Sequence, residues 1–306
     1  MFLAWFMALP TLPPAQVFPK LSRVQDAELL QWAAEGALAS EGVVYVLPGN
    51  PGLAAYYTDF AAHLHSKTRR TVLALGWLGF SEDGAAAQPR GRVDLEAQID
   101  FARASLPRDV PITLVGHSIG ALVALDLLSA PPPGVDIVAV VAVFPFVAAN
   151  PANPTFLAKF QGCLTLAKYA PVLRALAWVL QRIPEKPRAW LLSKVGQETA
   201  HMSAASRALT LDAMTRPSNV AAMINMGASE FESDRITKGP DLTWLHRKAD
   251  VTVVFSTAPD CWVKNGAREA LDELGVHTVL LDAAHDFCTC SKASIRVADA
   301  VADVLR

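Results

Sequence analysis

The chain has 306 residues, of which 52% are hydrophobic and 18% charged, with a formal net charge of −2. This length is enough for one large α/β domain or for two smaller domains. A charge so close to neutral gives no sign of a nucleic-acid partner, which argues against that functional class.

The first fourteen residues, MFLAWFMALPTLPP, are apolar but do not resemble a secretion signal. They lack a basic n-region and a small-residue cleavage site, and the apolar run is too short to span a bilayer. Two interpretations stay open. The segment is either a strand or loop that covers the core, or a shallow membrane anchor with Phe2, Trp5 and Phe6 in the interface.

Six short aliphatic runs predict buried strands. They are residues 43–47, 71–75, 112–115, 136–144, 251–255 and 277–281. Most of these runs are continuous in Val, Ile and Leu instead of alternating with polar residues. Such continuity is typical of strands that are covered on both faces in a parallel sheet.

Helical patterns separate most of these strands. They cover residues 54–66, 92–106, 119–129, 265–274 and 293–305. Strands that alternate with helices predict βαβ crossovers. We therefore expect an α/β protein with a doubly wound, mostly parallel sheet.

Residues 145–248 depart from this alternation, because they contain helical stretches with Pro-rich joints and no convincing strand. An apolar stripe at helical spacing is formed by Val172, Leu176, Leu180 and Ile183. We expect residues 1–144 and 249–306 to form the core, and 145–248 to form a helical cap or lid over the C-terminal edge of the sheet. The alternative is a helical layer with no lid role, and stripes of this kind more often belong to a core than to a membrane contact.

The sequence GHSIG is a G-x-S-x-G pattern formed by Gly116, His117, Ser118, Ile119 and Gly120. The pattern occurs by chance in roughly one chain of this length in ten, so its surroundings must decide its meaning. It lies on the turn from a predicted strand to a predicted helix, which is the position of a nucleophile elbow. Gly116 and Gly120 leave space where strand and helix would otherwise collide with the serine backbone. The alternative is an ordinary turn between a strand and a helix.

A serine nucleophile needs a base, and the base needs an acid that orients it. In doubly wound hydrolases these partners follow the serine on loops at strand ends, in the order Ser, acid, His. Asp260 follows the fifth predicted strand and His285 follows the sixth, so the sequence predicts a catalytic triad of Ser118, Asp260 and His285. Taken alone, each is as readily an ordinary turn or surface residue. Asp282 and Asp286 are weaker candidates for the acid, because residues so near in sequence do not easily reach the His285 ring.

An oxyanion hole requires two backbone donors near the serine. One is expected to be the N–H of Ile119, and the other to come from the loop 48–52, Pro-Gly-Asn-Pro-Gly. Proline has no N–H, so Asn50 is the best-placed donor, while Gly49 and Gly52 allow unusual backbone angles. The alternative is that this loop is a plain tight turn.

No metal site or cofactor is expected, because the seven histidines are scattered and the cysteines show no metal-binding pair. The cysteines are Cys163, Cys261, Cys288 and Cys290. The last two are too close for a relaxed disulfide in regular structure, and we interpret all four as reduced thiols of a cytosolic protein.

The pairing of PGNPG-x(4)-Y, residues 48–57, with GHSIG resembles the lipid droplet-associated serine hydrolases. Similar segments are FPF and NPANPTF after the fourth predicted strand, LEAQIDFA before the nucleophile strand, and AHDF near the C-terminus. The resemblance covers residues 43–305 approximately. It implies an α/β-hydrolase with a helical cap, and it assigns the nucleophile, acid and base of that family to Ser118, Asp260 and His285.

The resemblance also implies a lipid-ester substrate and association with the cytosolic side of the lipid droplet surface, with the endoplasmic reticulum membrane as a further location. We therefore predict a serine esterase or lipase-like hydrolase of sterol esters or acylglycerols. One alternative is a droplet-surface binding protein with this fold and little turnover. Another is an acyltransferase or thioesterase with the same triad, because these reactions differ only in leaving group and acceptor.

Overall fold

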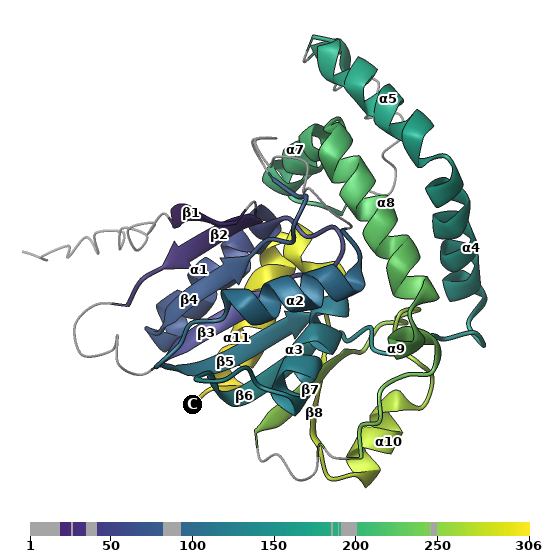
Figure 1. Ribbon diagram of the computed structural model, residues 1–306. Coiled ribbons are helices and arrows are strands. Elements are labelled where there is room, and N and C mark those ends of the chain that lie inside the picture. The colour runs from purple at the N-terminus through teal and green to yellow at the C-terminus, as the bar shows by residue number, and fades with distance from the viewer. Residues whose placement is uncertain are drawn as a thin grey trace, which may run out of the picture.

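The computed structural model describes residues 19–25, 27–34, 42–81, 93–184, 186–188, 190, 201–243, 245 and 250–306. The sequence interpretations of residues 1–14 therefore lie outside the described residues. An eight-stranded sheet runs through the centre, with the strand order β1-β2-β4-β3-β5-β6-β7-β8 (Figure 1). Its strands are β1 (Lys20–Val24), β2 (Ala27–Trp32), β3 (Val43–Leu47), β4 (Thr71–Leu75), β5 (Pro111–His117), β6 (Asp136–Val143), β7 (Val251–Ser256) and β8 (His277–Leu281).

Strands β3 to β8 pair in parallel, and they are the six strands that the sequence predicts. The aliphatic runs of β3, β4, β5 and β7 are largely buried because helices cover both faces of the sheet. The prediction of burial is wrong for β8, the edge strand, whose residues are all partly or fully exposed, and for the first four residues of β6. Strands β1 and β2 were not predicted from the sequence; they form an antiparallel hairpin that joins the sheet where β2 pairs with β4. These strands mix charged and apolar residues at the sheet edge, so they lack a continuous aliphatic run.

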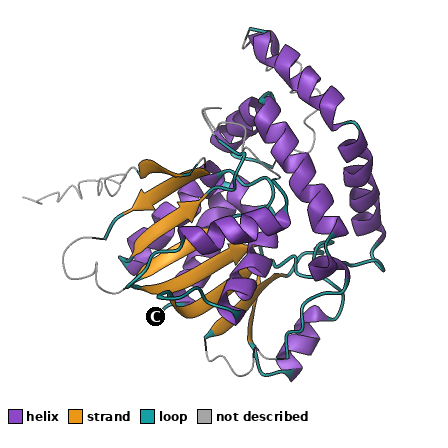
Figure 2. Ribbon diagram, in the orientation of Figure 1, coloured by secondary structure: helices purple, strands orange, loops and turns teal. Residues whose placement is uncertain are grey.

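Helices cover the two faces of the sheet as a doubly wound fold requires (Figure 2). On one face, α1 (Thr58–Thr68) packs against α11 (Ser291–Val304), and on the other α2 (Leu95–Ser105) packs against α3 (Ile119–Ser129) (Figure 1). The smaller elements of the core are η2 (Ala54–Tyr57), α10 (Ala267–Glu273) and η5 (Phe287–Thr289). The predicted helices are thus confirmed with small shifts at their ends.

The described part of the chain between β6 and β7 consists of helices and the loops that connect them, and it contains no strand. Its helices are α4 (Pro154–Lys168), α5 (Ala170–Arg182), α7 (Ala204–Ala213), α8 (Pro217–Glu232) and α9 (Asp234–Thr237). Figure 1 shows α8 beside the sheet, with α4 and α5 on its outer side. We call Pro154–Arg182 the α4–α5 arm. Asn153 caps its first helix by accepting hydrogen bonds from the N–H groups of Thr155 and Phe156.

The apolar stripe of α5 does not pack into a core. Val172 is 64% exposed and Leu176 is 52% exposed. The helix instead contacts α8 through a different row of side chains that includes Leu173 and Ala177. The packing face is set by the position of α8, and much of the stripe is left on the surface.

Within the described residues, no single helix is both long and apolar enough to cross a membrane. The two helices of the α4–α5 arm reach that length and composition only when counted together, and they are bent by 79° relative to each other.

Candidate active site

Ser118 lies on a sharp turn between β5 and α3, with φ 54° and ψ −121°. Two glycines make this turn possible. A Cβ on Gly116 would lie 2.4 Å from the Gly120 carbonyl oxygen, and a Cβ on Gly120 would lie 2.4 Å from the Leu47 carbonyl oxygen. The positive φ of a serine is a strained conformation of the kind found at functional sites.

The side chains of Ser118, His285 and Asp260 form one hydrogen-bonded chain. The Ser118 Oγ lies 2.9 Å from His285 Nε2, and His285 Nδ1 lies 2.7 Å from Asp260 Oδ2. A carboxylate accepts, so Nδ1 carries the hydrogen and Nε2 presents its lone pair to the serine hydroxyl. The structure therefore brings together the three residues that the sequence selects.

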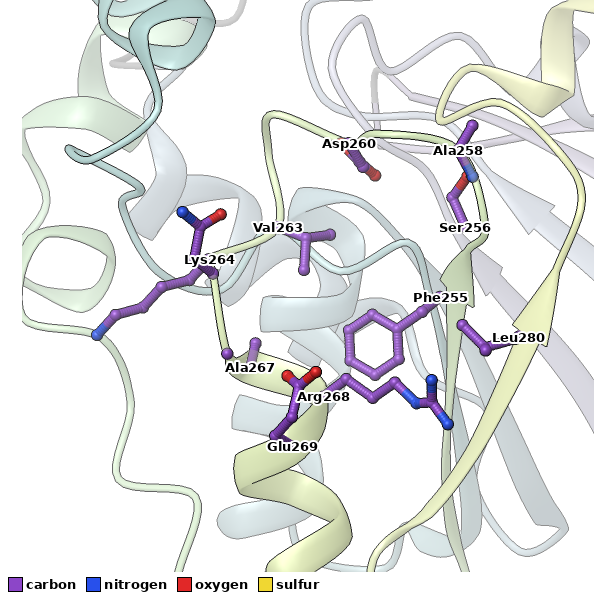
Figure 3. Close-up of a pocket in the computed structure, with 12 residues that line it drawn as sticks. Phe255, Ser256, Ala258, Asp260, Val263, Lys264, Ala267, Arg268, Glu269 and Leu280 are labelled. Atoms are coloured by element: carbon purple, nitrogen blue, oxygen red, sulfur yellow. The ribbon is translucent and has the colours of Figure 1, made fainter.

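Asp260 is held on both carboxylate oxygens, and its side chain is 8% exposed. Its Oδ1 accepts a hydrogen bond of 3.0 Å from the Trp262 backbone N–H, while Oδ2 faces His285. Asp260 also lines a hollow of about 200 Å³ together with Phe255, Lys264 and Arg268. Figure 3 shows these four side chains. Neither Ser118 nor His285 lines this hollow, so it is separate from the pocket at the nucleophile.

The two other acidic candidates near His285 point elsewhere. Asp286 pairs with His201, and Asp282 pairs with Arg296. Both contacts are near the surface. The choice of Asp260 over its rivals is therefore supported by geometry as well as by sequence order.

The loop 48–52 lies directly against the nucleophile. A Cβ on Gly49 would be 3.2 Å from both the His117 ring and the Ser118 Cβ, and one on Gly52 would overlap the Trp77 ring. The Gly49 N–H is engaged with the Tyr57 hydroxyl at 2.8 Å, and Pro51 has none to give. The Asn50 N–H stays the predicted donor of this loop, and Asn50 lines the pocket beside Ser118.

Ile119 begins α3, and its N–H is one of the first helical amides, which have no acceptor one turn earlier in their own helix. Helix N-termini favour negative charge. The two sequence-predicted donors, Asn50 and Ile119, therefore lie on the loop and on the helix that flank Ser118.

A mainly apolar pocket of about 260 Å³ opens at Ser118 and His285. The inserted helical segment contributes four of its lining residues, Met202, Thr210, Met214 and Met223. Methionine side chains are flexible and polarizable, so they adapt to apolar ligands of varied shape. The three methionines therefore give the pocket beside Ser118 an adaptable apolar wall.

Two buried titratable groups stand near this pocket. Burial, with a smaller contribution from His285, lowers the pKa of His117 to about 3. Burial also raises the pKa of Glu230 on α8 to about 8. The neighbouring Asn50 side chain donates to the Met223 carbonyl oxygen at 3.2 Å. This bond joins the loop 48–52, which we call the oxyanion loop after its predicted role, to α8.

Some residues near the site were not predicted from the sequence, namely Tyr57, Trp262, Glu230 and the methionines of the pocket. Of these residues, only Tyr57 belongs to a sequence pattern that could have identified it, because it is the tyrosine of PGNPG-x(4)-Y. The others lie on segments whose distance from Ser118 depends on the tertiary fold. Within the described residues, no three His, Cys, Asp or Glu side chains gather in a way that would hold a metal ion.

A family model described as "Lipid-droplet associated hydrolase" matches residues 40–288. The lipid droplet-associated hydrolase of Rattus norvegicus is 26% identical over 247 residues, which are 71% of this chain and 72% of that protein. The Homo sapiens relative is 33% identical over 108 residues, which cover 29% of this chain and only 33% of that protein.

A solved structure with the same fold is a soluble variant of monoglyceride lipase from Saccharomyces cerevisiae, in complex with a substrate analog. Its TM-score is 0.54 at 14% identity, and the match covers 96% of each chain. At this identity the likeness speaks for the fold alone, which is that of an α/β-hydrolase.

Proposed function

The chain belongs to the lipid-droplet associated hydrolase family, and we propose that it hydrolyses lipid carboxylic esters through Ser118, His285 and Asp260. The observation that carries the proposal is the hydrogen-bonded chain Ser118–His285–Asp260, with separations of 2.9 and 2.7 Å. A serine hydroxyl within hydrogen-bond reach of an oriented imidazole is the arrangement that activates it as a nucleophile.

In the proposed reaction, Ser118 Oγ attacks the ester carbonyl carbon while its proton passes to His285 Nε2. The carbonyl oxygen becomes an oxyanion that accepts hydrogen bonds from the N–H groups of Asn50 and Ile119. His285 then returns the proton to the leaving alcohol, and water attacks the acyl-serine by the same route. Asp260 keeps the imidazole in the required tautomer and stabilises its protonated form.

The substrate that we propose is a fatty acyl ester of a sterol or of glycerol. The proposal is supported by the apolar character of the pocket at Ser118 and by the three methionines that line it. We also propose that residues 145–248 act as a cap, because the pocket is lined partly by this inserted segment. A panel of esters of graded acyl length would show which chain the pocket prefers.

We propose further that the α4–α5 arm contacts the surface of a lipid droplet or the endoplasmic reticulum membrane from the cytosol. Exposed apolar side chains gather on it, namely Leu157, Leu166, Tyr169, Val172, Leu176, Trp178 and Val179. The arm has four basic residues, Lys159, Lys168, Arg174 and Arg182, and no Asp or Glu. Apolar side chains beside basic ones are suited to a surface of anionic phospholipid head groups.

Two variants separate the reaction from lipid contact. Ser118→Ala is expected to lower hydrolysis of p-nitrophenyl butyrate by roughly 10⁴-fold or more, and to float with phospholipid-coated triolein droplets like the parent. The double variant Val172→Asp, Leu176→Asp is expected to float less while hydrolysing this soluble ester. Leu21→Asp is the matched control, because Leu21 is an exposed leucine outside the arm.

If the Ser118→Ala protein hydrolyses the ester as fast as the parent, the proposed mechanism is wrong. Labelling with a fluorophosphonate probe distinguishes the rival function, because a droplet-binding protein with a distorted triad would float but label poorly. Unchanged flotation of the arm variant would instead overturn the proposed lipid contact alone.

A further inference from the structure

Three loops that meet at the nucleophile are joined by two side chains outside the proposed triad. The Gly49 N–H lies 2.8 Å from the Tyr57 Oη, and that oxygen lies 2.6 Å from His117 Nδ1. On the other side of the ring, His117 Nε2 lies 2.8 Å from the backbone carbonyl oxygen of His285. The connection therefore runs from the oxyanion loop, through the elbow, to the loop of the base.

The chemistry of these groups fixes every hydrogen in the connection. A carbonyl oxygen only accepts, so His117 Nε2 carries a hydrogen that it donates to His285. In a neutral imidazole the other nitrogen is then an acceptor, and it receives the Tyr57 hydroxyl hydrogen. The Tyr57 oxygen in turn accepts the Gly49 N–H. Only this one placement of the hydrogens gives every donor of the connection an acceptor.

The surroundings keep this arrangement neutral. Burial lowers the pKa of His117 to about 3, with a smaller effect of His285, and burial raises the pKa of Tyr57 well above its ordinary value. Cys288 and Tyr56 are the other titratable groups that act on Tyr57, and burial raises the pKa of each to about 12. At neutral pH none of these groups gains or loses a proton, so the hydrogen-bond directions do not change.

Aromatic packing restricts the same side chains. The Phe287 ring lies edge-on to the His117 ring, with centroids 4.9 Å apart, and to the Tyr57 ring, at 6.3 Å. Phe60 of α1 packs on Phe287 from the core at 5.5 Å. The rings therefore have little freedom to turn away from their hydrogen-bond partners.

We propose that Tyr57 and His117 are positioning residues that set the oxyanion loop and the His285 loop relative to Ser118. The inference rests on the proposed hydrolase function and deepens it. Gly49 directly precedes Asn50, so the hydroxyl that holds the Gly49 N–H restricts the movement of the loop that carries the Asn50 N–H. The His117 Nε2–H anchors the backbone of His285, whose ring must stay within reach of Ser118 Oγ.

Tyr57→Phe is the decisive variant, because it keeps the ring and its packing and removes only the hydroxyl. It leaves the Gly49 N–H and His117 Nδ1 without partners, and we expect kcat to fall roughly 10- to 100-fold with KM changed less than about threefold. Tyr45→Phe is the matched control. Tyr45 is a buried tyrosine of β3 whose hydroxyl donates to the Ser105 carbonyl oxygen at 3.3 Å, away from the pocket.

A conservative replacement at His117 provides a second test. His117→Gln retains an N–H that can donate toward the His285 carbonyl oxygen, whereas His117→Leu has none. We expect His117→Gln to retain at least about tenfold more kcat than His117→Leu, the ratio that one hydrogen bond of this kind supports. Equal kcat values in the two variants, with both folded by circular dichroism, would contradict the anchoring role.

The tautomer of His117 is measured independently of activity by two-dimensional ¹⁵N NMR, with its signal assigned as the one lost in His117→Gln. We expect the Nε2–H tautomer in the parent from pH 5 to 8, and a mixed population in Tyr57→Phe. A parent spectrum with the Nδ1–H tautomer would overturn the inference, as would kcat in Tyr57→Phe equal to that in Tyr45→Phe. If the parent is inactive but has the Nε2–H tautomer, the proposed function is wrong, while the hydrogen-bonded connection through Tyr57 and His117 is present as described.

Discussion

Two apolar helices of this protein have opposite surroundings. Helix α3 starts at the nucleophile and has nine of its eleven residues buried, whereas α5 has one buried residue, Ala177, among thirteen. Helix α3 lies between β5, β6 and α2, but α5 packs mainly on α8. The burial of these two helices therefore differs because α3 has more neighbouring elements than α5, and not because only α3 is apolar.

The contrast also separates two roles within one chain. Around α3 the packing is dense because the elbow, the oxyanion loop and the sheet must keep fixed positions. Around α5 an apolar face remains open, as we propose for contact with lipid. Variants with the same chemical change in both regions measure how much the two regions differ in their effect on stability and activity.

The largest difference is expected for leucines truncated to alanine. Leu127 of α3 is 0% exposed, and Leu127→Ala should lower the free energy of unfolding by about 2–5 kcal/mol. Leu176 of α5 is 52% exposed, and Leu176→Ala should change it by less than about 0.5 kcal/mol. Urea denaturation of both variants measures the difference. Similar losses would mean that α5 is buried in the folded protein.

A second pair adds a methyl group to a glycine in each region. In Gly120→Ala the new Cβ meets the Leu47 carbonyl oxygen at 2.4 Å and the Pro48 carbonyl oxygen at 2.6 Å, so the oxyanion loop must move. We expect a loss of about 1–3 kcal/mol of stability, together with lower ester hydrolysis.

Gly162 of α4 has no atom within 4 Å of the added Cβ, so Gly162→Ala should raise stability by up to about 1 kcal/mol. Thermal unfolding and hydrolysis rates of both variants test the pair. A stabilised and fully active Gly120→Ala protein would show that the close approach at the elbow is not required.

The last prediction concerns α8, the helix between the two regions, and it is a slope of stability with pH instead of a fixed loss. The pKa of Glu230 is about 8 in the folded protein against an ordinary value of 4.5, so the folded state keeps a proton that the unfolded chain releases in this window. Stability should therefore fall as pH rises from 4.5 to 8, by at most about 1.4 kcal/mol per pH unit. Glu230→Gln should remove that slope.

Glu232→Gln is the control for this prediction, because Glu232 is exposed on the same helix. Chemical denaturation at a series of pH values compares the three proteins. Parallel slopes in the parent and Glu230→Gln would show that Glu230 is not held protonated by burial.

Much of the core could be predicted from the sequence. The six parallel strands follow from continuous aliphatic runs, and Ser118, Asp260 and His285 stand in the loops after three of them. Parallel strands bring their carboxyl ends to one edge of the sheet, so residues far apart in sequence become neighbours by a general rule. The site residues were predictable because this rule needs only local patterns and their order.

The sequence by itself thus determined the sheet, the elbow and the order of its polar partners, since short-range periodicity and backbone geometry specify them. Only the tertiary structure decided that the β1–β2 hairpin extends the sheet and that Tyr57 joins His117 to Gly49. It also decided which face of α5 is open. These outcomes depend on contacts between residues far apart in the chain, which no local pattern specifies.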